Sequence, residues 1–449
     1  MRLEGKNVLV VGLGESGKAA ARFAAARGAA VTVTDRRSAA ELGEAVEEMG
    51  RLGARLALGE HPRALFVAQD LIVPSPGVPW NLPELEAARR EGVAVMGELE
   101  IAASFLNGPV IGITGTNGKT TTTSLIGHIF ETAGVKAATG GNLGTPVLAM
   151  ADESSHDRWN VLELSSFQLE ATSTFPVHIG VVLNVTPDHL DRHGAFEAYA
   201  AAKGRMFQAQ TAADFAVLHA DDAVCHGYAA QAAGSVYWFS RTSRTEPGAW
   251  VEDGWIVCDG RRVAEAKLPI PGPHNLENSL AAVVAATLAG VDAAPIADAL
   301  RSFRTSEHRL ELVAEIDGVA YYNDSKATNV DAAKKAIETF DHGLWVILGG
   351  SDKGLEYAAL REPLAGRARA ALLIGESAHK IEHDLAGVVP AVHAGDLRAA
   401  LSYARGRAEP GDTVLLSPAC ASFDQFRNYG DRGRQFKEMV QALRPEVKV

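Results

Sequence analysis

Residues 109–123 read PVIGITGTNGKTTTT and carry the pattern that decides the architecture of the chain. The apolar run from Val110 predicts a buried strand. Glycines at its end leave backbone N–H groups free to point at an anion, because glycine adopts conformations that other residues avoid. Lys119 adds a cation, and Thr120 adds a hydroxyl group suited to Mg²⁺. The stretch therefore predicts a phosphate-binding loop after a strand.

The residues that follow the loop predict a helix. TTTSLIGHIFETAG places apolar side chains at helical spacing and ends at Gly134. The loop would then lie at a helix N-terminus, where the helix dipole favours phosphate. The strict G-x-x-x-x-G-K-[ST] pattern is not met because residue 113 is Ile, and an ordinary glycine turn is the alternative interpretation.

Length and composition limit the class of protein. A chain of 449 residues is long for one hydrophobic core, so we expect about three domains. The net charge of −12 argues against broad binding to nucleic acid or to anionic membranes. Three widely spaced cysteines fit a reducing compartment, and no apolar run is long enough to span a bilayer. We expect a cytoplasmic location without membrane insertion.

A βαβ unit precedes the phosphate loop. A strand over residues 7–11 runs into a G-x-G-x-x-G turn at 12–17, and a second strand ends at Asp35. This motif indicates a phosphate near a helix N-terminus but does not identify the nucleotide. A strand over 70–73 ends in a rigid proline turn at 74–79, which is either a ligand-binding edge or an ordinary surface turn. We place the first domain at residues 1–97 and expect residues 97–100 to form a linker to the strand that carries the phosphate loop.

The second domain, residues 98–305, shows buried-looking strands that end in polar residues. Glu163 closes one strand and is either a Mg²⁺ ligand or a solvated strand end. Residues 184–191 follow the next strand and bring one histidine and two carboxylates into a turn, where helix capping is the simpler explanation. Asn275 and Asn278 share one face at the start of a helix, as caps or as ligand contacts.

Residues 306–449 predict a further doubly wound α/β domain. Polar loops follow three of its strands, at 323–329, 349–354 and 417–422. Carboxyl ends of parallel strands meet at one edge of a sheet, so these loops predict a site.

Five motifs together resemble those of the Mur ligases of bacterial peptidoglycan synthesis. The motifs are GTNGKT at 115–120, GNLG at 141–144, ELSSFQ at 163–168, NVTPDH at 184–189 and HNLEN at 274–278. The segments NDSKATN at 323–329 and SPACASFDQF at 417–426 look like those of the D-glutamate-adding branch. The Asp-Asn-Pro-Arg motif of the diamino-acid-adding branch is absent. Folylpolyglutamate synthase shares the central design but lacks this amino-terminal domain.

The resemblance implies an α/β fold of three domains: a Rossmann-like amino-terminal domain, a central P-loop ATPase domain with a mostly parallel sheet, and a Rossmann-like carboxy-terminal domain. It also implies an ATP-dependent amide ligase that acts as a monomer. The carboxylate of UDP-N-acetylmuramoyl-L-alanine would take the γ-phosphoryl group of ATP, and the amine of D-glutamate would attack the acyl phosphate. Backbone donors, a lysine and two Mg²⁺ ions would neutralise the charge.

By the same resemblance, four groups of residues form the site. The catalytic residues are Lys119, Glu163, His189 and Lys203, and the metal ligands are Thr120, Glu163, His189 and Lys203, with Lys203 carried as a carbamate. The ATP contacts are Gly115, Thr116, Asn117, Gly118, Lys119, Thr120, Thr121, Asn275, Arg309 and Asp324. The UDP contacts are Gly14, Ser16, Asp35, Arg37, Ser75, Gly77 and Asn142. The D-glutamate contacts are Thr328, Lys353, Ser422 and Tyr429, where Tyr429 departs from an expected phenylalanine.

Two other classes of protein remain as alternatives. A nicotinamide-dependent oxidoreductase would use the glycine turn at 12–17, but it leaves the phosphate loop and Glu163 unexplained. A nucleotide-binding switch would hydrolyse ATP without ligation.

Overall fold

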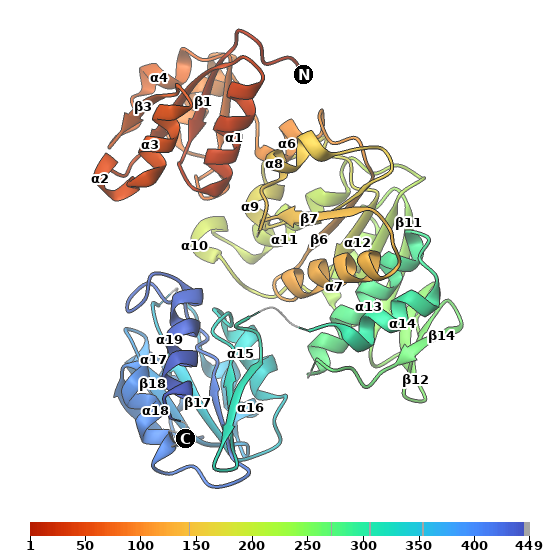
Figure 1. The fold of residues 1–449 in the computed structure, drawn as a ribbon, viewed down its shortest axis with the longest axis vertical. Helices are drawn as coiled ribbons and strands as arrows, with labels where there is room; N and C mark the ends of the chain where they lie inside the picture. The colour runs from red at the N-terminus through yellow and green to blue at the C-terminus, as the bar shows by residue number, and fades with distance from the viewer. Residues whose placement is uncertain (143, 271, 305–306, 353, 444–449) are drawn as a thin grey trace, which may run out of the picture. The chain divides into compact units, whose positions relative to one another are not determined.

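A computed structural model describes residues 1–142, 144–270, 272–304, 307–352 and 354–443, and it confirms the predicted α/β class. The strands of the described residues form three sheets (Figure 1). The chain divides into two compact units. One unit consists of Met1–Ala266 and Glu277–Leu300, and the other of Lys267–Leu276 and Arg301–Val449.

The first sheet is parallel and has the strand order β3-β2-β1-β4-β5. Its strands are β1 (Asn7–Val11), β2 (Ala30–Asp35), β3 (Arg55–Leu58), β4 (Leu71–Pro74) and β5 (Ala94–Val95). Its helices are α1 (Glu15–Ala26), α2 (Ala39–Leu42), α3 (Glu44–Arg51), α4 (Arg63–Val67) and α5 (Pro83–Arg90). The chain leaves β1 toward β2 and later returns to β4 on the other side, so a crevice opens at the carboxyl ends of β1 and β4.

The central sheet has the order β14-β13-β12-β11-β10-β9-β6-β8-β7. Its strands are β6 (Val110–Thr114), β7 (Ala137–Gly141), β8 (Trp159–Glu163), β9 (Ile179–Val182), β10 (Phe215–His219), β11 (Ser235–Ser240), β12 (Gly248–Glu252), β13 (Trp255–Cys258) and β14 (Arg261–Glu265). Pairing is parallel from β7 through β12 and antiparallel at β13 and β14. The predicted mostly parallel sheet is thus confirmed, and β12, β13 and β14 form an antiparallel meander at one end of it.

The helices around the central sheet connect its strand ends. They are α6 (Glu98–Ala102), α7 (Lys119–Thr132), α8 (Val147–Met150), α9 (Ser166–Leu169), α10 (Leu190–His193), α11 (Phe196–Gly204), α12 (Ala223–Ala229), α13 (Pro273–Leu288) and α14 (Ala293–Ser302), with 3₁₀ turns η1 (Ala151–Glu153) and η2 (Arg205–Phe207). Within the described part of the chain, no helix has the length and apolar character needed to cross a membrane.

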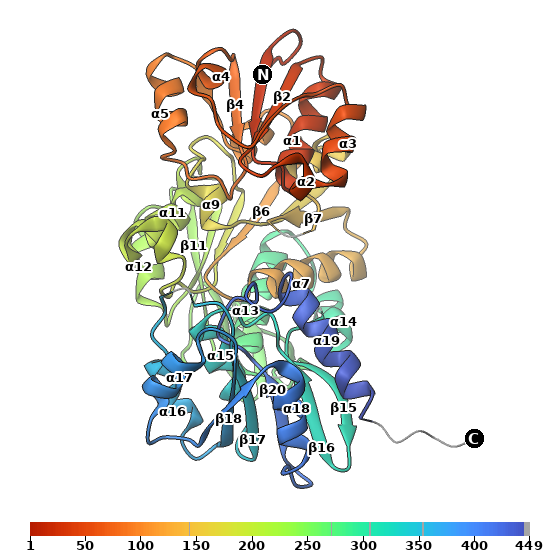
Figure 2. The ribbon, with the colours of Figure 1, turned by 90° about the vertical axis from the view of Figure 1, so that its left-hand side faces the viewer.

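The third sheet has the order β15-β16-β20-β17-β18-β19 and is parallel except for the β15–β16 pair (Figure 2). Its strands are β15 (Glu311–Ile316), β16 (Val319–Asn323), β17 (Leu344–Gly349), β18 (Ala368–Ile374), β19 (Ala391–Gly395) and β20 (Thr413–Leu416). Its helical segments are α15 (Val330–Ile337), η3 (Ala358–Leu360), α16 (Arg361–Leu364), α17 (Ala378–Leu385), α18 (Leu397–Arg405) and α19 (Tyr429–Gln441). One buried cluster packs α15, α16 and α17 on one face, and another packs α18 and α19 on the opposite face.

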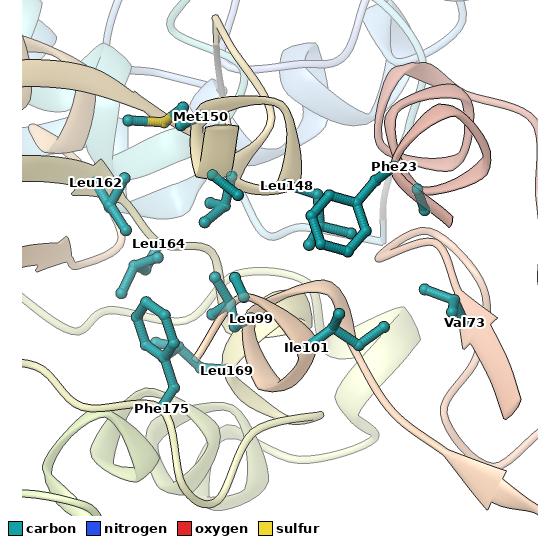
Figure 3. Packing of buried hydrophobic residues seen from close by; sticks show 14 of the residues in the cluster. Phe23, Val73, Leu99, Ile101, Leu148, Met150, Leu162, Leu164, Leu169 and Phe175 are labelled. Carbon is teal, nitrogen blue, oxygen red and sulfur yellow. The ribbon is translucent and has the colours of Figure 1, made fainter. Parts of the chain in front are cut away.

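A continuous hydrophobic core joins the first sheet to the central sheet. Figure 3 shows Leu99 and Ile101 of α6 between Phe23 of the first sheet's layer and Leu164 of the central layer. The sequence predicts a linker at residues 97–100, but these residues are packed. Glu98 is buried and its carboxyl group accepts a hydrogen bond from the Leu148 N–H at 3.2 Å. A side chain at residue 97 would collide with Ala171, which explains the glycine there.

Leu99→Ala tests this shared core. Leu99 is 1% exposed, so its truncation leaves a cavity and lowers the free energy of unfolding of the first unit by about 2–5 kcal/mol. Leu190→Ala is the matched control in the same unit, because Leu190 is 39% exposed and its loss costs about 0.5 kcal/mol or less. Urea titration followed by tryptophan fluorescence measures both variants. Equal midpoints for the two variants would show that α6 does not hold a core.

Candidate active site

The predicted UDP contacts lie together around one cavity. The cavity has a volume of about 530 Å³ and occupies the crevice at the carboxyl ends of β1 and β4. All seven predicted residues line it, namely Gly14, Ser16, Asp35, Arg37, Ser75, Gly77 and Asn142. The glycine turn and the proline turn, which are distant in sequence, therefore face the same space. The Ser75 hydroxyl links the two turns, because it donates a hydrogen bond to the Gly12 carbonyl oxygen at 2.9 Å.

Asp35 is fixed as an anion at the wall of this cavity. Its carboxylate accepts the Leu13 N–H at 2.7 Å and the Arg37 guanidinium at 2.8 and 3.0 Å. Burial by itself raises the pKa of Asp35, but the hydrogen bonds from Arg37 and Leu13 outweigh it and bring the pKa down to about 2. The Asp35–Arg37 pair therefore presents polar groups in a fixed geometry to a ligand.

His61 is a cavity residue that the sequence analysis missed. It lines the same space, and its Nδ1 lies 2.9 Å from the Thr34 hydroxyl oxygen. Burial and then the charge of Arg36 lower the pKa of His61. This histidine belongs to no sequence motif. It lies in the loop between β3 and α4, and the fold brings that loop to the cavity.

The predicted phosphate loop joins β6 to α7. Gly118 has φ +90° and is the N-cap of α7, and Gly115 has φ +147°, so both positions require glycine. The end of β9 holds the loop in place, because the Asn184 carbonyl accepts the Thr116 N–H at 2.8 Å and the Asn184 side chain accepts the Asn117 N–H at 2.9 Å. Lys119 folds back over the loop and donates to the Gly115 carbonyl at 2.8 Å.

A second lysine meets the same carbonyl oxygen. Lys203 of α11 is 1% exposed and donates to the Gly115 carbonyl at 2.9 Å. Burial and then the charge of Lys119 lower the pKa of Lys203 well below its usual value. The structure thus brings together two of the predicted catalytic residues, Lys119 and Lys203.

Glu163 stands between the loop and the UDP cavity. It is 2% exposed, and its carboxylate accepts the Thr120 hydroxyl at 2.7 Å and the Asn142 amide at 3.0 Å. A carboxylate and a hydroxyl at the end of a phosphate loop are the hard oxygen ligands that Mg²⁺ prefers, so these residues fit the implied metal. Thr121, another predicted ATP contact, is buried in the first turn of α7.

His189 lies in the left-handed region with φ +53° at the N-cap of α10. Its Nε2 lies 3.7 Å from the carboxylate of Asp188, and its ring packs against Phe167 with centroids 4.8 Å apart. The histidine and carboxylate predicted at this turn are therefore adjacent in space.

The second unit holds the other predicted ATP contacts. Asp324 follows β16, and its carboxyl group accepts the Ser417 hydroxyl at 2.9 Å and the Leu310 N–H at 3.2 Å. Burial raises the pKa of Asp324 to about 7, against the opposing effects of these hydrogen bonds and of the Arg309 charge. Asn275 is buried in the first turn of α13.

A buried arginine that the sequence analysis missed contacts the two loops that carry Thr328 and Ser422, two of the predicted D-glutamate contacts. Arg432 of α19 is fully buried, and it donates to the hydroxyl and carbonyl oxygens of Ser325 at 3.0 and 2.8 Å and to the Cys420 carbonyl at 3.2 Å. The Ser325 hydroxyl in turn donates to the Tyr429 carbonyl at 2.8 Å. Arg432 therefore fixes the two polar loops that carry Thr328 and Ser422. Lys353 lies outside the described residues.

Gly118→Ala tests the loop geometry. A Cβ atom at residue 118 would lie 2.2 Å from Oδ1 of Asn278, on a backbone with positive φ, so we expect ATP binding to weaken by more than about tenfold. Gly134→Ala is the control, because Gly134 also has positive φ at the other end of α7 but has no neighbour within 4 Å of a Cβ atom. Calorimetric titration with an ATP analogue measures both variants. Unchanged affinity in Gly118→Ala would refute the assigned role of the loop.

Asp324→Asn tests the buried carboxyl group. The folded state holds its proton up to a pH of about 7, whereas the unfolded state releases it near the ordinary pKa of 3.8. The wild-type protein therefore loses stability, on the order of a few kcal/mol, as the pH rises from about 4 to 7, and the loss is complete above 7. The Asn variant lacks this loss.

Urea unfolding between pH 5 and 8 measures the difference, and it should grow with pH in favour of Asp324→Asn. The exposed Asp317→Asn provides the control and should follow the wild-type curve. If all three stability curves run parallel, the pKa of Asp324 is not raised.

Models of three Mur ligase domains match the chain. A MurD-like N-terminal domain matches residues 6–97, a Mur ligase middle domain matches 113–286, and a Mur ligase glutamate ligase domain matches 308–420. Among solved structures, UDP-N-acetylmuramate-alanine ligase MurC from Thermotoga maritima has a TM-score of 0.63 at 20% identity, covering 97% of this chain and 99% of that one. MurF ligase from the same organism, in complex with ADP, has a TM-score of 0.61 at 17% identity, covering 98% of this chain and 95% of that one. These two structures support the three-domain fold.

Curated relatives match the whole length of the chain. Two proteins named UDP-N-acetylmuramoylalanine--D-glutamate ligase are 56% identical, from Solibacter usitatus, and 53% identical, from Acidobacterium capsulatum. Each alignment covers 99% of this chain, and they cover 100% and 98% of the respective relatives. At this identity and coverage, the chain belongs to the Mur ligase family.

Proposed function

We propose that the chain is an ATP-dependent ligase that forms the amide bond between UDP-N-acetylmuramoyl-L-alanine and D-glutamate during synthesis of the peptidoglycan precursor. Its full-length relatives carry that activity in their name. The observation that carries the proposal is a hydrogen-bonded path within the first unit. Asn142 lines the predicted UDP cavity and binds Glu163, which binds Thr120 of the phosphate loop.

This path accounts for the order of the chemistry. The cavity holds the UDP group, so the L-alanyl carboxylate of the substrate extends along Asn142 toward the phosphate loop. ATP with Mg²⁺ supplies the electrophilic γ-phosphoryl group. Lys119 and the loop N–H groups neutralise the phosphate charge, and Glu163 and Thr120 supply oxygen ligands for the metal. Positioning and charge neutralisation activate the carboxylate without a protein nucleophile.

The second unit supplies the amine in this proposal. D-glutamate carries two carboxylates, which hydroxyl groups, backbone N–H groups and a cation bind well. Thr328 and Ser422 lie on the two loops that Arg432 fixes, and Tyr429 begins the adjacent helix α19. By the family resemblance, Arg309 and Asp324 of this unit are proposed as ATP contacts. We further propose that the enzyme works as a monomer in the cytoplasm.

Phosphate release from ATP separates this function from its alternatives. The ligase releases phosphate only when both UDP-N-acetylmuramoyl-L-alanine and D-glutamate are present, and it forms the amide product in equal amount. A nucleotide-binding switch would release phosphate without either substrate. Binding of a nicotinamide nucleotide without ATP turnover would instead support an oxidoreductase that uses the glycine turn at 12–17.

Lys203 is proposed to act as a carbamate, formed by addition of CO₂ to its neutral amine. A buried lysine next to Lys119 is easily deprotonated, and carbamylation converts it from a second cation into an anion. The anion would then join Glu163 and His189 as a Mg²⁺ ligand. The burial of Lys203 and its position against the loop carbonyl support this role.

Lys203→Ala removes the carbamate, and we expect kcat to fall at least about a hundredfold. Small carboxylates such as acetate or formate should partly restore activity, because they can occupy the space of the lost anion. Lys136→Ala is the control, since the Lys136 side chain is 71% exposed and pairs with Asp157. The coupled phosphate-release assay measures each variant. Full activity of Lys203→Ala without additives would exclude the carbamate.

A further inference from the structure

Two histidines and a glutamate gather on the surface of the second unit. His379 and Glu382 lie on α17, three residues apart and thus on one helix face, and His393 lies on β19, the edge strand of the third sheet. One possible ligand atom from each residue lies within 4.8 Å of the others. All three residues are exposed, and none of them belongs to the predicted active site.

The internal geometry of this cluster is compact. Nε2 of His393 lies 2.8 Å from Oε2 of Glu382, and the rings of His379 and His393 have centroids 4.7 Å apart. Four-coordinate zinc with bonds of about 2.0–2.1 Å needs ligand atoms about 3.3 Å apart. The three atoms lie within 4.8 Å of one another on exposed side chains, so each separation has to change by about 1.5 Å or less.

The donor set selects the class of metal. Two imidazoles and one carboxylate suit Zn²⁺ and its transition-metal neighbours, whereas Mg²⁺ prefers oxygen ligands alone. His379 lies in the first turn of α17, where the helix dipole disfavours a cation, but the Glu382 carboxylate supplies a compensating negative charge. A surface hydrogen bond between Glu382 and His393 would explain why those two side chains lie close together. It would not explain why the imidazole ring of His379 lies beside that of His393.

We propose that His379, Glu382 and His393 form a binding site for one Zn²⁺ ion, with water as the fourth ligand. The ion clamps edge strand β19 to α17. Helix α17 follows β18, and the residue before it contacts the loop after β17: the Ser377 hydroxyl oxygen accepts the Gly350 N–H at 3.1 Å. Zinc binding therefore stabilises the side of the sheet on which that loop rests. This site is independent of the proposed ligase function.

Isothermal titration of the full chain with ZnCl₂, in excess Mg²⁺ and without a chelating nucleotide, tests the site. We expect one zinc ion to bind per chain at this position, and His393→Ala should weaken its binding by more than about tenfold. Glu382→Gln should have the same effect, although it keeps a group that can hydrogen-bond to His393. The control is His383→Ala, because the His383 side chain is 89% exposed on the same helix and lies beside Asp384 instead.

Thermal unfolding provides the second measurement. Zinc should raise the Tm of the wild type and of His383→Ala, but not the Tm of His393→Ala or Glu382→Gln. All three substituted positions are exposed, so the variants fold without metal. Equal zinc affinity in wild type and His393→Ala would overturn the proposal, and so would the absence of zinc binding to the wild type.

Discussion

The carbonyl oxygen of Gly115 accepts hydrogen bonds from two lysine side chains, and the chemistry of the central site depends on this contact. Lys119 reaches it from the loop's own helix at 2.8 Å, and Lys203 reaches it from α11 at 2.9 Å. Burial, and then the charge of Lys119, lower the pKa of Lys203 well below its usual value, so Lys203 is the lysine that gives up its proton more readily. The site is therefore built to receive negative charge, although the chain as a whole carries a net charge of −12.

The contact requires a backbone that only glycine provides. Gly115 has φ +147° and packs against Leu183 and Asn184 at the end of β9, so the neighbouring strand fixes the direction of its carbonyl group. Glu163 ends the strand on the other side of β6. The register of three adjacent parallel strands, β9, β6 and β8, thus sets the positions of the phosphate loop and of the Glu163 carboxylate.

The sequence predicted those parts of the fold and site that depend on local pattern. Glycine turns after apolar runs located β1, β6 and the helices that follow them. The motif resemblance supplied seven predicted UDP contacts, and all seven line one cavity. Local pattern failed where tertiary packing decides the structure. The segment Gly97 to Glu100 is predicted to be a linker because its polar residues suggest exposure. In the structure Glu98 is buried, and its carboxyl group accepts a hydrogen bond from the Leu148 N–H of α8. His61 was not predicted because tertiary packing, and not a local sequence pattern, places it at the cavity.

Arg432 shows most clearly what a sequence cannot reveal. Burying a guanidinium group costs free energy unless oxygen atoms accept its hydrogen bonds. For Arg432 these oxygens belong to Ser325, about a hundred positions earlier in the chain, and to Cys420. Burial lowers its pKa only to about 10, so it stays charged at neutral pH. Its binding partners are backbone carbonyls and one hydroxyl, which leave no recognisable motif. The shape of the proposed D-glutamate site thus depends on Arg432, which hydrogen-bonds to both loops. The motifs that the sequence shows belong to the loops and do not include Arg432.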